Sequence, residues 1–464
     1  MIPSFETIKP RVVPPLDKNF RPAALVNGMF RQEVEKNGVP LILGLERNEG
    51  QISCFETLIF PESHPKSASN LSYIERLVKF LLWQRGGYKL YVGGPKSIGE
   101  NLQKIYSAKG KQAFDYDFMG RQVYEKPFMI ITCEVSQVPQ ARETGQRLGR
   151  HLEGNRIGFD LGASDRKVSA VVDGKTIYSE EVIWEPRKHS DPEYHYSEIV
   201  KAIRTAAGKM PRVDAIGGSS AGIYIDNRPM VASLFRAIPA ERYGEIRNLF
   251  LRIRDEMHVP LEVINDGDVT ALAGSMSIED NGVLGIALGS SEAVGYVDMN
   301  GRIMGWLNEL AFAPVDYNAH APIEEWSGDI GCGASYFSQQ CVFRLAPAAG
   351  IQIPTDITDA DKLKFVQEKL EAGHEGASQI WRSMGIYLGY ALAHYADFYD
   401  MKHVLILGRC TSGRGGEILL NQAQAVLKAE FPNLANQFKI HLPDEKIRRV
   451  GQSVAAASLP MIEK

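Results

Sequence analysis

Two carboxylates, Asp160 and Asp266, each follow an apolar run and are candidates for metal binding or acid–base catalysis. Asp160 ends the apolar run Ile157-Gly158-Phe159 and precedes a turn of small residues, Gly162-Ala163-Ser164. Such a turn lets backbone N–H groups approach phosphate oxygens, and a neighbouring carboxylate can hold Mg²⁺ directly or through water. The segment therefore predicts a β-hairpin with a phosphate and magnesium site, although similar turns also occur in ordinary hairpins.

Asp266 comes directly after the apolar segment 261–264 and Asn265, and a helical pattern begins at once behind it. A carboxylate between the end of a strand and the start of a helix suits a general base that takes a proton from a hydroxyl group. The amide of Asn265 could orient the same substrate. The simpler alternative is that Asp266 or Asp268 only caps the helix.

Two further segments place small polar residues where apolar runs end. The strand predicted over 213–216 leads through Gly217-Gly218 to the hydroxyl groups of Ser219 and Ser220. This pattern fits close approach to a ligand, but also a plain turn from a strand to a helix. Gly289-Ser290-Ser291 follows the apolar run 283–288 and repeats the pattern of the first hairpin, so it predicts a second phosphate-binding turn.

Late in the chain, a buried strand near 402–407 leads into a loop rich in glycine, which contains Gly408 and Gly413. An adenine ring could fit between such a loop and a neighbouring helix. The final helix begins near Gly451, and its face of small residues could pack closely against this loop.

The composition is that of an ordinary globular protein. The chain has 464 residues, of which 44% are hydrophobic and 23% charged, so two or three domains are expected. A net charge of -4 gives no reason to expect nucleic acid or an anionic membrane as partner. Five scattered cysteines, no signal peptide and no apolar run of about 18 residues favour a cytoplasmic protein.

The first part of the chain contains its own α/β pattern. A hairpin is predicted over 40–60, a helix over 71–84 and a strand over 89–92, and the same order recurs between residues 157 and 216. This order suggests a degenerate internal repeat that lacks the acid, but it is also a common order of elements. A strand near 128–135 and an amphipathic helix over 140–152 are predicted before the first hairpin described above.

The order of these motifs resembles the actin, Hsp70 and sugar-kinase superfamily, and within it the ROK/glucokinase branch. Asp160-Leu161-Gly162-Ala163-Ser164 stands where the family has Asp-Ile-Gly-Gly-Thr, and Ile264-Asn265-Asp266 matches its catalytic Asn-Asp. Leu288 to Ser291 takes the place of Gly-Thr-Gly, and Asn308 to Phe312 that of Gly-Glu-Ile-Gly-His. Trp326-Ser327-Gly328 resembles the Ser-Gly of glucokinases. The resemblance covers about two thirds of the chain, from Arg156 onward.

The resemblance implies an α/β protein with two ribonuclease-H-like lobes of the actin-like ATPase fold, over 155–280 and 281–464, after an extra region over 1–154. It implies ATP and Mg²⁺ as cofactors, a small-molecule sugar as substrate, and a homodimer as an expectation from the family alone. Asp266 would be the catalytic base and Asp160 the magnesium residue. The implied ATP-binding residues are Asp160, Gly162, Ser164, Gly289, Ser290, Ser291, Gly408 and Gly413, and the implied sugar-binding residues are Asn265, Glu309, Ser220, Glu324 and Glu325.

The chain also departs from the family pattern. Phe312 replaces a histidine that binds sugar and, in many members, zinc; Ala163 and Ser291 replace glycines, and Asp165 brings a negative charge to the first phosphate turn. The aromatic residues Trp306, Phe312 and Trp326 fit either a core or a platform for a sugar. The sequence therefore favours a carbohydrate kinase, with a catalytically inactive sugar or nucleotide sensor as the alternative. A chaperone-like or reactivase-like ATPase fits less well, because Asn-Asp and Glu309 indicate a polyol ligand.

Overall fold

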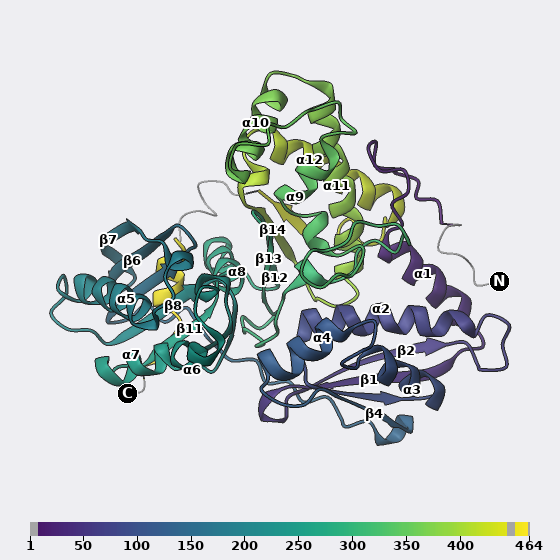
Figure 1. The fold of residues 1–464 in the computed structure, drawn as a ribbon, viewed down its shortest axis with the longest axis horizontal. Helices are drawn as coiled ribbons and strands as arrows, with labels where there is room; N and C mark the ends of the chain where they lie inside the picture. The colour runs from purple at the N-terminus through teal and green to yellow at the C-terminus, as the bar shows by residue number, and fades with distance from the viewer. Residues whose placement is uncertain (1–7, 443–450, 463–464) are drawn as a thin grey trace. The chain divides into compact units, whose positions relative to one another are not determined.

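The computed structural model describes residues 8–442 and 451–462, and these form two compact units (Figure 1). The described residues of the first unit are 8–144, 286–293 and 306–442, and those of the second are 145–285, 294–305 and 451–462. Residues 8–144 thus belong to one compact unit with later segments of the chain. The division of the chain into functional regions over 1–154, 155–280 and 281–464 stays a prediction.

The second unit is built on a five-stranded sheet with the order β11-β8-β5-β6-β7. Strands β5 to β7 form an antiparallel meander, and β8 and β11 are added parallel to β5, so their carboxyl ends meet at one edge. The strands are β5 (Asn155–Leu161), β6 (Asp165–Val172), β7 (Lys175–Ile183), β8 (Ala215–Ser220) and β11 (Leu261–Asn265), with a small second sheet of β9 (Ile223–Ile225) and β10 (Arg228–Val231).

Helices pack against this sheet, and α5 does so through an apolar stripe. Helix α5 starts at Pro192, where the missing N–H costs nothing, and Asp191 caps it by accepting the N–H of Glu193 at 3.2 Å. Its buried residues Ile199 and Ile203 join the core of the unit. The helices of the second unit are α5 (Pro192–Ala207), α6 (Tyr243–Arg247), α7 (Leu249–Met257), α8 (Asp266–Ile278) and α13 (Gln452–Ala457).

Helix α13 packs against β5, β8 and α8, and glycines make this packing possible. A Cβ atom at Gly158 would overlap the carbonyl oxygen of Ser453, and one at Gly217 would overlap that of Ala456. The prediction that the strand ends before Gly217 is therefore wrong, because β8 continues through both glycines to Ser220. The small residues of α13 lie against this sheet, a partner that the sequence did not indicate.

The first unit contains a four-stranded sheet with the order β2-β1-β3-β4. The strands are β1 (Val39–Glu46), β2 (Ile52–Ile59), β3 (Lys89–Gly93) and β4 (Met129–Cys133), and the helices of this region are α1 (Ala23–Val34), α2 (Ala68–Arg85), α3 (Lys96–Ile105) and α4 (Ala113–Asp117). Strand β3 is antiparallel to β1, whereas β8 is parallel to β5. The predicted internal repeat is therefore wrong, since the order of elements recurs but the direction of the last strand does not.

Later segments supply the rest of the first unit, in which α11 packs along α12 and α1 packs on α11. A second four-stranded sheet has the order β13-β12-β14-β15, and of it β14, β15 and residues 286–288 and 292–293 belong to the first unit. Its strands are β12 (Val283–Leu288), β13 (Glu292–Val297), β14 (His403–Leu407) and β15 (Lys439–His441), and the helices are α9 (Gln339–Leu345), α10 (Asp359–Glu371), α11 (Glu375–Tyr395) and α12 (Arg414–Glu430).

The helix predicted over 140–152 is wrong. This segment contains no helix, and it forms isolated backbone bridges with distant residues instead, Arg142 with Ile52 of β2 and Gln146 with Ile303. Backbone groups that are satisfied by such bridges are not available for a helical ladder, so the apolar spacing there reflects packing of an extended segment.

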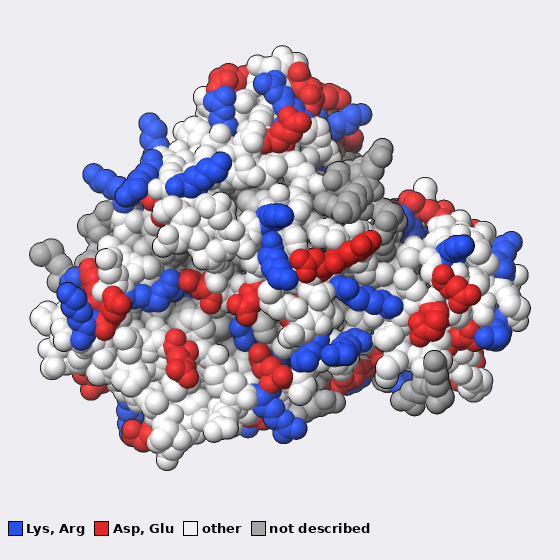
Figure 2. Space-filling view, turned by 180° about the vertical axis from the view of Figure 1, so that it is seen from behind, with Lys and Arg blue, Asp and Glu red and all other residues white. Residues whose placement is uncertain are grey.

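One face of the molecule carries charges of both signs. On the face drawn in Figure 2, Lys and Arg side chains alternate with Asp and Glu side chains among the described residues. Within 8–442 and 451–462, no helix combines the length and the apolar character needed to cross a membrane.

Candidate active site

The register of the parallel strands in the second unit brings the predicted polar residues to one edge of the sheet. Asp160 on β5 lies opposite Ser219 on β8, and Ser219 lies opposite Ile264 on β11. Asn265 ends β11 and Asp266 opens α8. Three segments separated by about 50 residues along the sequence thus converge, as the predicted site requires.

The two carboxylates are electrostatically coupled. The hydroxyl of Ser219 donates a hydrogen bond to Asp160 Oδ1 at 2.7 Å. Burial raises the pKa of Asp160, and burial together with the charge of Asp160 raises the pKa of Asp266 to about 6. A carboxylate with such a pKa is ionised at neutral pH and is a stronger base than an ordinary aspartate, which suits a general base.

The side chain of Asn265 caps helix α8. Its Oδ1 accepts the N–H of Gly267 at 2.7 Å and its amide donates to the carbonyl of Gly222 at 2.7 Å, so Asn265 is the N-cap of α8. Asp268 instead accepts the N–H of Tyr296 at 3.1 Å and is buried. Asp266 Oδ1 accepts the same N–H of Gly267 at 3.0 Å, so Asp266 contributes to the cap as well, while its charge is coupled to that of Asp160. The predicted contact of Asn265 with sugar stays a prediction.

Gln452, at the start of α13, reaches this edge of the sheet and was not singled out from the sequence. Its amide Nε2 donates to Ser219 Oγ at 3.0 Å and to the carbonyl of Asp266 at 3.2 Å. A chain of donors therefore runs from Gln452 through Ser219 to Asp160 and fixes the orientation of that carboxylate. Only the small-residue face of the last helix gave a hint of this close approach.

The remaining serine of this group, Ser220, is fully buried. Its Oγ accepts the phenolic hydroxyl of Tyr224 at 2.6 Å. The predicted contact between Ser220 and sugar is not tested by this arrangement and stays a prediction.

In the first predicted phosphate turn, local hydrogen bonds occupy two groups expected to bind phosphate. The N–H of Gly162 donates to the carbonyl of Asp165 at 2.9 Å, and the hydroxyl of Ser164 donates to Asp165 Oδ2 at 3.0 Å. Lys167 Nζ lies 3.9 Å from Asp165 Oδ1 and partly offsets its charge. Phosphate binding at this turn would require Ser164 to exchange its partner.

In the first unit, the second predicted turn lies beside the glycine-rich loop. The N–H of Gly289 donates to the carbonyl of Ser291 at 3.0 Å, and Ser290 and Ser291 are exposed. Gly408 has a φ of 97° and lies against the backbone of Leu288, so that a Cβ atom there would overlap the carbonyl oxygen of Leu288. Only glycine satisfies both conditions, and its presence brings the two predicted ATP-binding segments together.

Gly413 also has a positive φ, of 62°, and comes just before α12. The N–H of Arg414 donates to Glu371 Oε1 at 2.9 Å, so a carboxylate from α10 already occupies the start of this helix. Trp381 Nε1 donates to the carbonyl of Cys410 at 2.8 Å and fixes the middle of the loop.

Glu309 and Glu292 form an acidic pair in the first unit, and Glu292 was not singled out from the sequence. The N–H of Glu309 donates to the carbonyl of Trp83 at 2.9 Å. Glu292 is 3% exposed, and its Oε1 accepts the hydroxyl of Tyr395 at 3.3 Å. Burial, with a smaller contribution from the charge of Glu309, raises the pKa of Glu292 to about 8, so this carboxyl is protonated at neutral pH.

The segment predicted to supply further sugar-binding acids is a tight loop. Glu324 is buried, and its carboxylate accepts the N–H groups of Trp326 at 3.0 Å and Ser327 at 2.7 Å, whereas Glu325 is exposed. Phe312 stacks on Trp83 with ring centroids 4.2 Å apart and lies 6.3 Å from the ring of Trp326.

Trp306 belongs to another cluster. The guanidinium of Arg85 lies 3.9 Å from the centre of its ring, and the ring of Tyr399 packs beside it at 5.9 Å. The three predicted aromatic residues are therefore not one core cluster, and Trp326, which is 59% exposed, is the one that is open to a ligand.

Comparison with solved structures finds the same fold elsewhere. A ROK family transcriptional regulator, described as a homologue of the E. coli MLC protein, matches 66% of this chain and 78% of its own length, with a TM-score of 0.52 and 17% identity. The chain has the fold of the ROK proteins. This confirms the predicted α/β fold of the ROK kind.

Sugar kinases with the ROK fold are also matched. A ROK glucokinase from Streptomyces griseus, solved with glucose and AMPPNP, matches 66% of this chain and 99% of its own at 18% identity, with a TM-score of 0.49. A ROK hexokinase from Thermus thermophilus matches 66% and 98% at 18% identity, with a TM-score of 0.49. Neither the scan against protein-family models nor the search of curated proteins finds a match.

Proposed function

We propose that this protein transfers the terminal phosphoryl group of ATP to a hydroxyl group of a sugar or sugar derivative. The observation that carries the proposal is the position of Asp266 beside Asp160 at the carboxyl ends of parallel strands, with the pKa of Asp266 raised to about 6. Ligands of open α/β sheets bind at this edge. The ROK kinases matched above have sugar kinase activity in their descriptions, which agrees with the proposal.

In the proposed reaction, Asp266 accepts the proton of the acceptor hydroxyl as its oxygen attacks the terminal phosphorus, and the bond to ADP breaks. Asp160, oriented by Ser219 and Gln452, would hold Mg²⁺ directly or through water. Carboxylate oxygens suit this ion, and one or two protein carboxylates together with substrate phosphates are its usual ligands. Mg²⁺ would neutralise the charge on the phosphates, which is the main requirement of phosphoryl transfer.

The other predicted residues keep their proposed roles. Gly162, Ser164 and the segment 289–291 would contact the phosphates, Gly408 and Gly413 the adenosine, and Asn265, Ser220, Glu309, Glu324 and Glu325 the sugar. A cytoplasmic location and a homodimer are proposed on the resemblance alone.

A catalytically inactive sugar or nucleotide sensor is the second candidate. The observation that favours it is the first phosphate turn, where Ser164 donates to Asp165 and a negative charge stands beside the expected phosphates. The match to a ROK transcriptional regulator is compatible with such a role.

The test is release of ADP from ATP-Mg in the presence of hexoses, amino sugars and sugar acids, with Asp266→Asn in parallel. Loss of the base should lower sugar-dependent turnover by about 10²–10⁴-fold. Asp359→Asn is the matched control, because Asp359 also opens a helix but in α10, and it should keep full activity.

The result also separates the two candidates. No turnover, with a sugar or nucleotide still raising the melting temperature, would support the sensor. No turnover and no binding would exclude both the kinase and the sensor, and the protein would share only its fold with the ROK proteins.

A further inference from the structure

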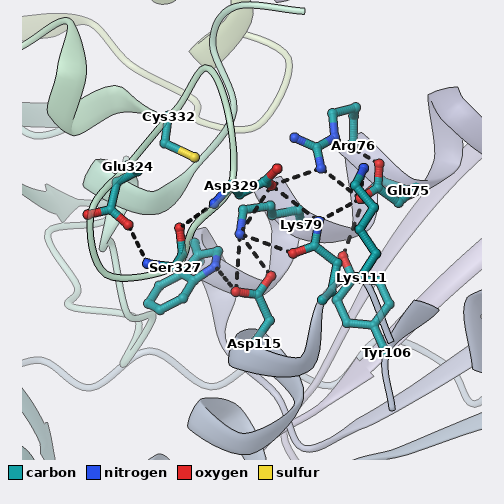
Figure 3. A network of polar contacts seen from close by, with 12 residues as sticks. Glu75, Arg76, Lys79, Tyr106, Lys111, Asp115, Glu324, Ser327, Asp329 and Cys332 are labelled. Carbon is teal, nitrogen blue, oxygen red and sulfur yellow. Dashed lines mark hydrogen bonds and ion pairs between the residues drawn. The ribbon is translucent and has the colours of Figure 1, made fainter. Parts of the chain in front are cut away.

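A buried ionic network joins the N-terminal part of the first unit to the loop 322–332 of the same unit (Figure 3). Lys79 on α2 is fully buried, and its Nζ lies 3.0 Å from Asp115 Oδ2 and 3.4 Å from Asp329 Oδ2. Arg76 lies 2.6 Å from Glu75 and 2.8 Å from Asp329. Buried charges are costly unless they are paired, so these contacts fix the positions of all five side chains.

The electrostatics show how tightly Asp329 is held. Burial alone would raise the pKa of its carboxyl group, but the charges of Arg76 and Lys79 outweigh burial and hold that pKa below its usual range. Gln112 adds a hydrogen bond to Asp329 Oδ2 at 3.2 Å. Asp329 therefore stays ionised and bound to α2 and to the segment before α4 at neutral pH.

Asp329 is at the same time part of a closed loop. Its carbonyl accepts the N–H of Glu324 at 2.8 Å, and its Oδ1 accepts the N–H of Ile330 at 2.8 Å. The carbonyl of Glu324 accepts the N–H of Gly328 at 2.9 Å, and the carboxylate of Glu324 binds the N–H groups of residues 326 and 327. Asp329 thus fixes one end of the loop 322–332. Because the loop is closed by its own hydrogen bonds, the position of this end determines where the tip of the loop lies.

The tip of the loop is open to solvent. Trp326 is 59% exposed and Glu325 is exposed, while the anchoring carboxylate of Asp329 is buried. The tip carries Glu325, one of the residues proposed above to contact sugar. The charged and amide side chains that bind the carboxylate of Asp329 in this network come from residues 76–112, in a region that has no counterpart in the glucokinase pattern.

We propose that Asp329 is a positioning residue, through which the N-terminal region holds the loop 322–332 in the shape that binds sugar. The inference rests on the proposed function, because it assigns the tip of this loop to the sugar. It gives the extra N-terminal region a role in the site that the sequence alone did not suggest.

Asp329→Asn tests the proposal without leaving a buried cation alone. In this variant Arg76 keeps Glu75 and Lys79 keeps Asp115, so we expect the protein to fold. The matched control is Lys111→Gln, which removes an ion pair with Glu75 in the same network but does not touch the loop. If Asp329→Asn does not give folded protein, Gln112→Ala takes its place, because it removes the hydrogen bond to Asp329 together with those to Glu75 and Lys79, and exchange in the loop should then rise by a smaller factor.

The first measurement is hydrogen exchange of the amides in 322–332, which needs no ligand. We expect exchange at residues 326–328 to rise about tenfold in Asp329→Asn and to stay unchanged in Lys111→Gln, since the closed loop opens more often once it is released. The second measurement is the KM for sugar, which should rise about tenfold while kcat changes less than about twofold.

A rise in both the amide exchange rate and KM in Asp329→Asn, but not in Lys111→Gln, supports the proposal. Unchanged exchange, or faster exchange with an unchanged KM, overturns it, as does an equal effect of the Lys111 control. If the unmodified protein neither turns over nor binds any sugar, the proposed function fails first and the positioning role fails with it. The exchange data would then still show whether Asp329 anchors the loop, so the two failures can be told apart.

Discussion

Replacement of Glu292 by Gln should change the pH dependence of stability by a predictable amount. Glu292 is 3% exposed, and its pKa is raised from 4.5 to about 8 by burial and, to a smaller extent, by Glu309. The folded protein therefore holds a proton that the unfolded chain releases above pH 4.5. Stability from this group is complete below pH 4.5 and is lost as the pH rises toward 8.

The magnitude follows from the two pKa values. Each pH unit between 4.5 and about 8 removes about 1.4 kcal/mol, so the total loss is about 5 kcal/mol. Gln has the same shape, keeps an acceptor for Tyr395 and does not titrate. The Glu292→Gln protein should be little changed at pH 4.5 and more stable than the original by several kcal/mol at pH 8.

The assay is chemical unfolding of both proteins between pH 4.5 and 8, with the free energy of unfolding compared at each pH. Glu368→Gln is the control, because Glu368 lies on α10 with its side chain 67% exposed, and this variant should follow the original protein. Parallel curves for the original and the Glu292→Gln protein would refute the reasoning, because they would mean that Glu292 ionises alike in the folded and unfolded states.

Three further changes test the second unit. Gly158→Ala should destabilise the protein by about 3 kcal/mol or more, because the new Cβ overlaps the backbone of α13, whereas Gly244→Ala, where nothing lies within 4 Å, should be neutral or slightly stabilising in urea unfolding. Gln452→Ala should lower sugar-dependent kcat/KM by about tenfold, because its hydrogen bonds to Ser219 and to the carbonyl of Asp266 are lost, and unchanged kinetics would exclude the positioning role of Gln452. Asp160→Asn should lower the pKa of Asp266 below about 6 while burial keeps it above 3.8, and an unshifted carboxyl titration by NMR would argue against coupling of the two groups.

The convergence of Asp160 and Asp266 at one edge of the sheet in the second unit could be predicted because its signals are local. The apolar runs before Asp160 and Asp266 identify two buried strands, and the carboxyl ends of parallel strands meet at one edge of a sheet. The fold followed from the order of these motifs. A polar residue directly after a strand can be recognised from the sequence without information on distant contacts.

Other features depend on contacts between distant parts of the chain, which leave no local pattern. Gly217 was interpreted as a sign of a loop, but its small size serves the approach of α13 to β8. The direction of β3 could not be read from the order of elements, so the predicted repeat was wrong. Gln452 and Asp329 look like ordinary polar residues until their partners more than 200 residues away are known.

The packing of α13 also affects when the second unit can fold during synthesis. Arg156, at the start of β5, is fully buried and donates a hydrogen bond to the carbonyl of Ala457, 301 residues later. At about 5–20 residues per second, a ribosome needs roughly 15–60 seconds to make the intervening chain. During that time the glycine-lined face of β5 and β8 has no helix to cover it, so this sheet is completed only after most of the polypeptide has emerged. A nascent chain of this protein should therefore depend on protection by chaperones for longer than its two compact units would suggest.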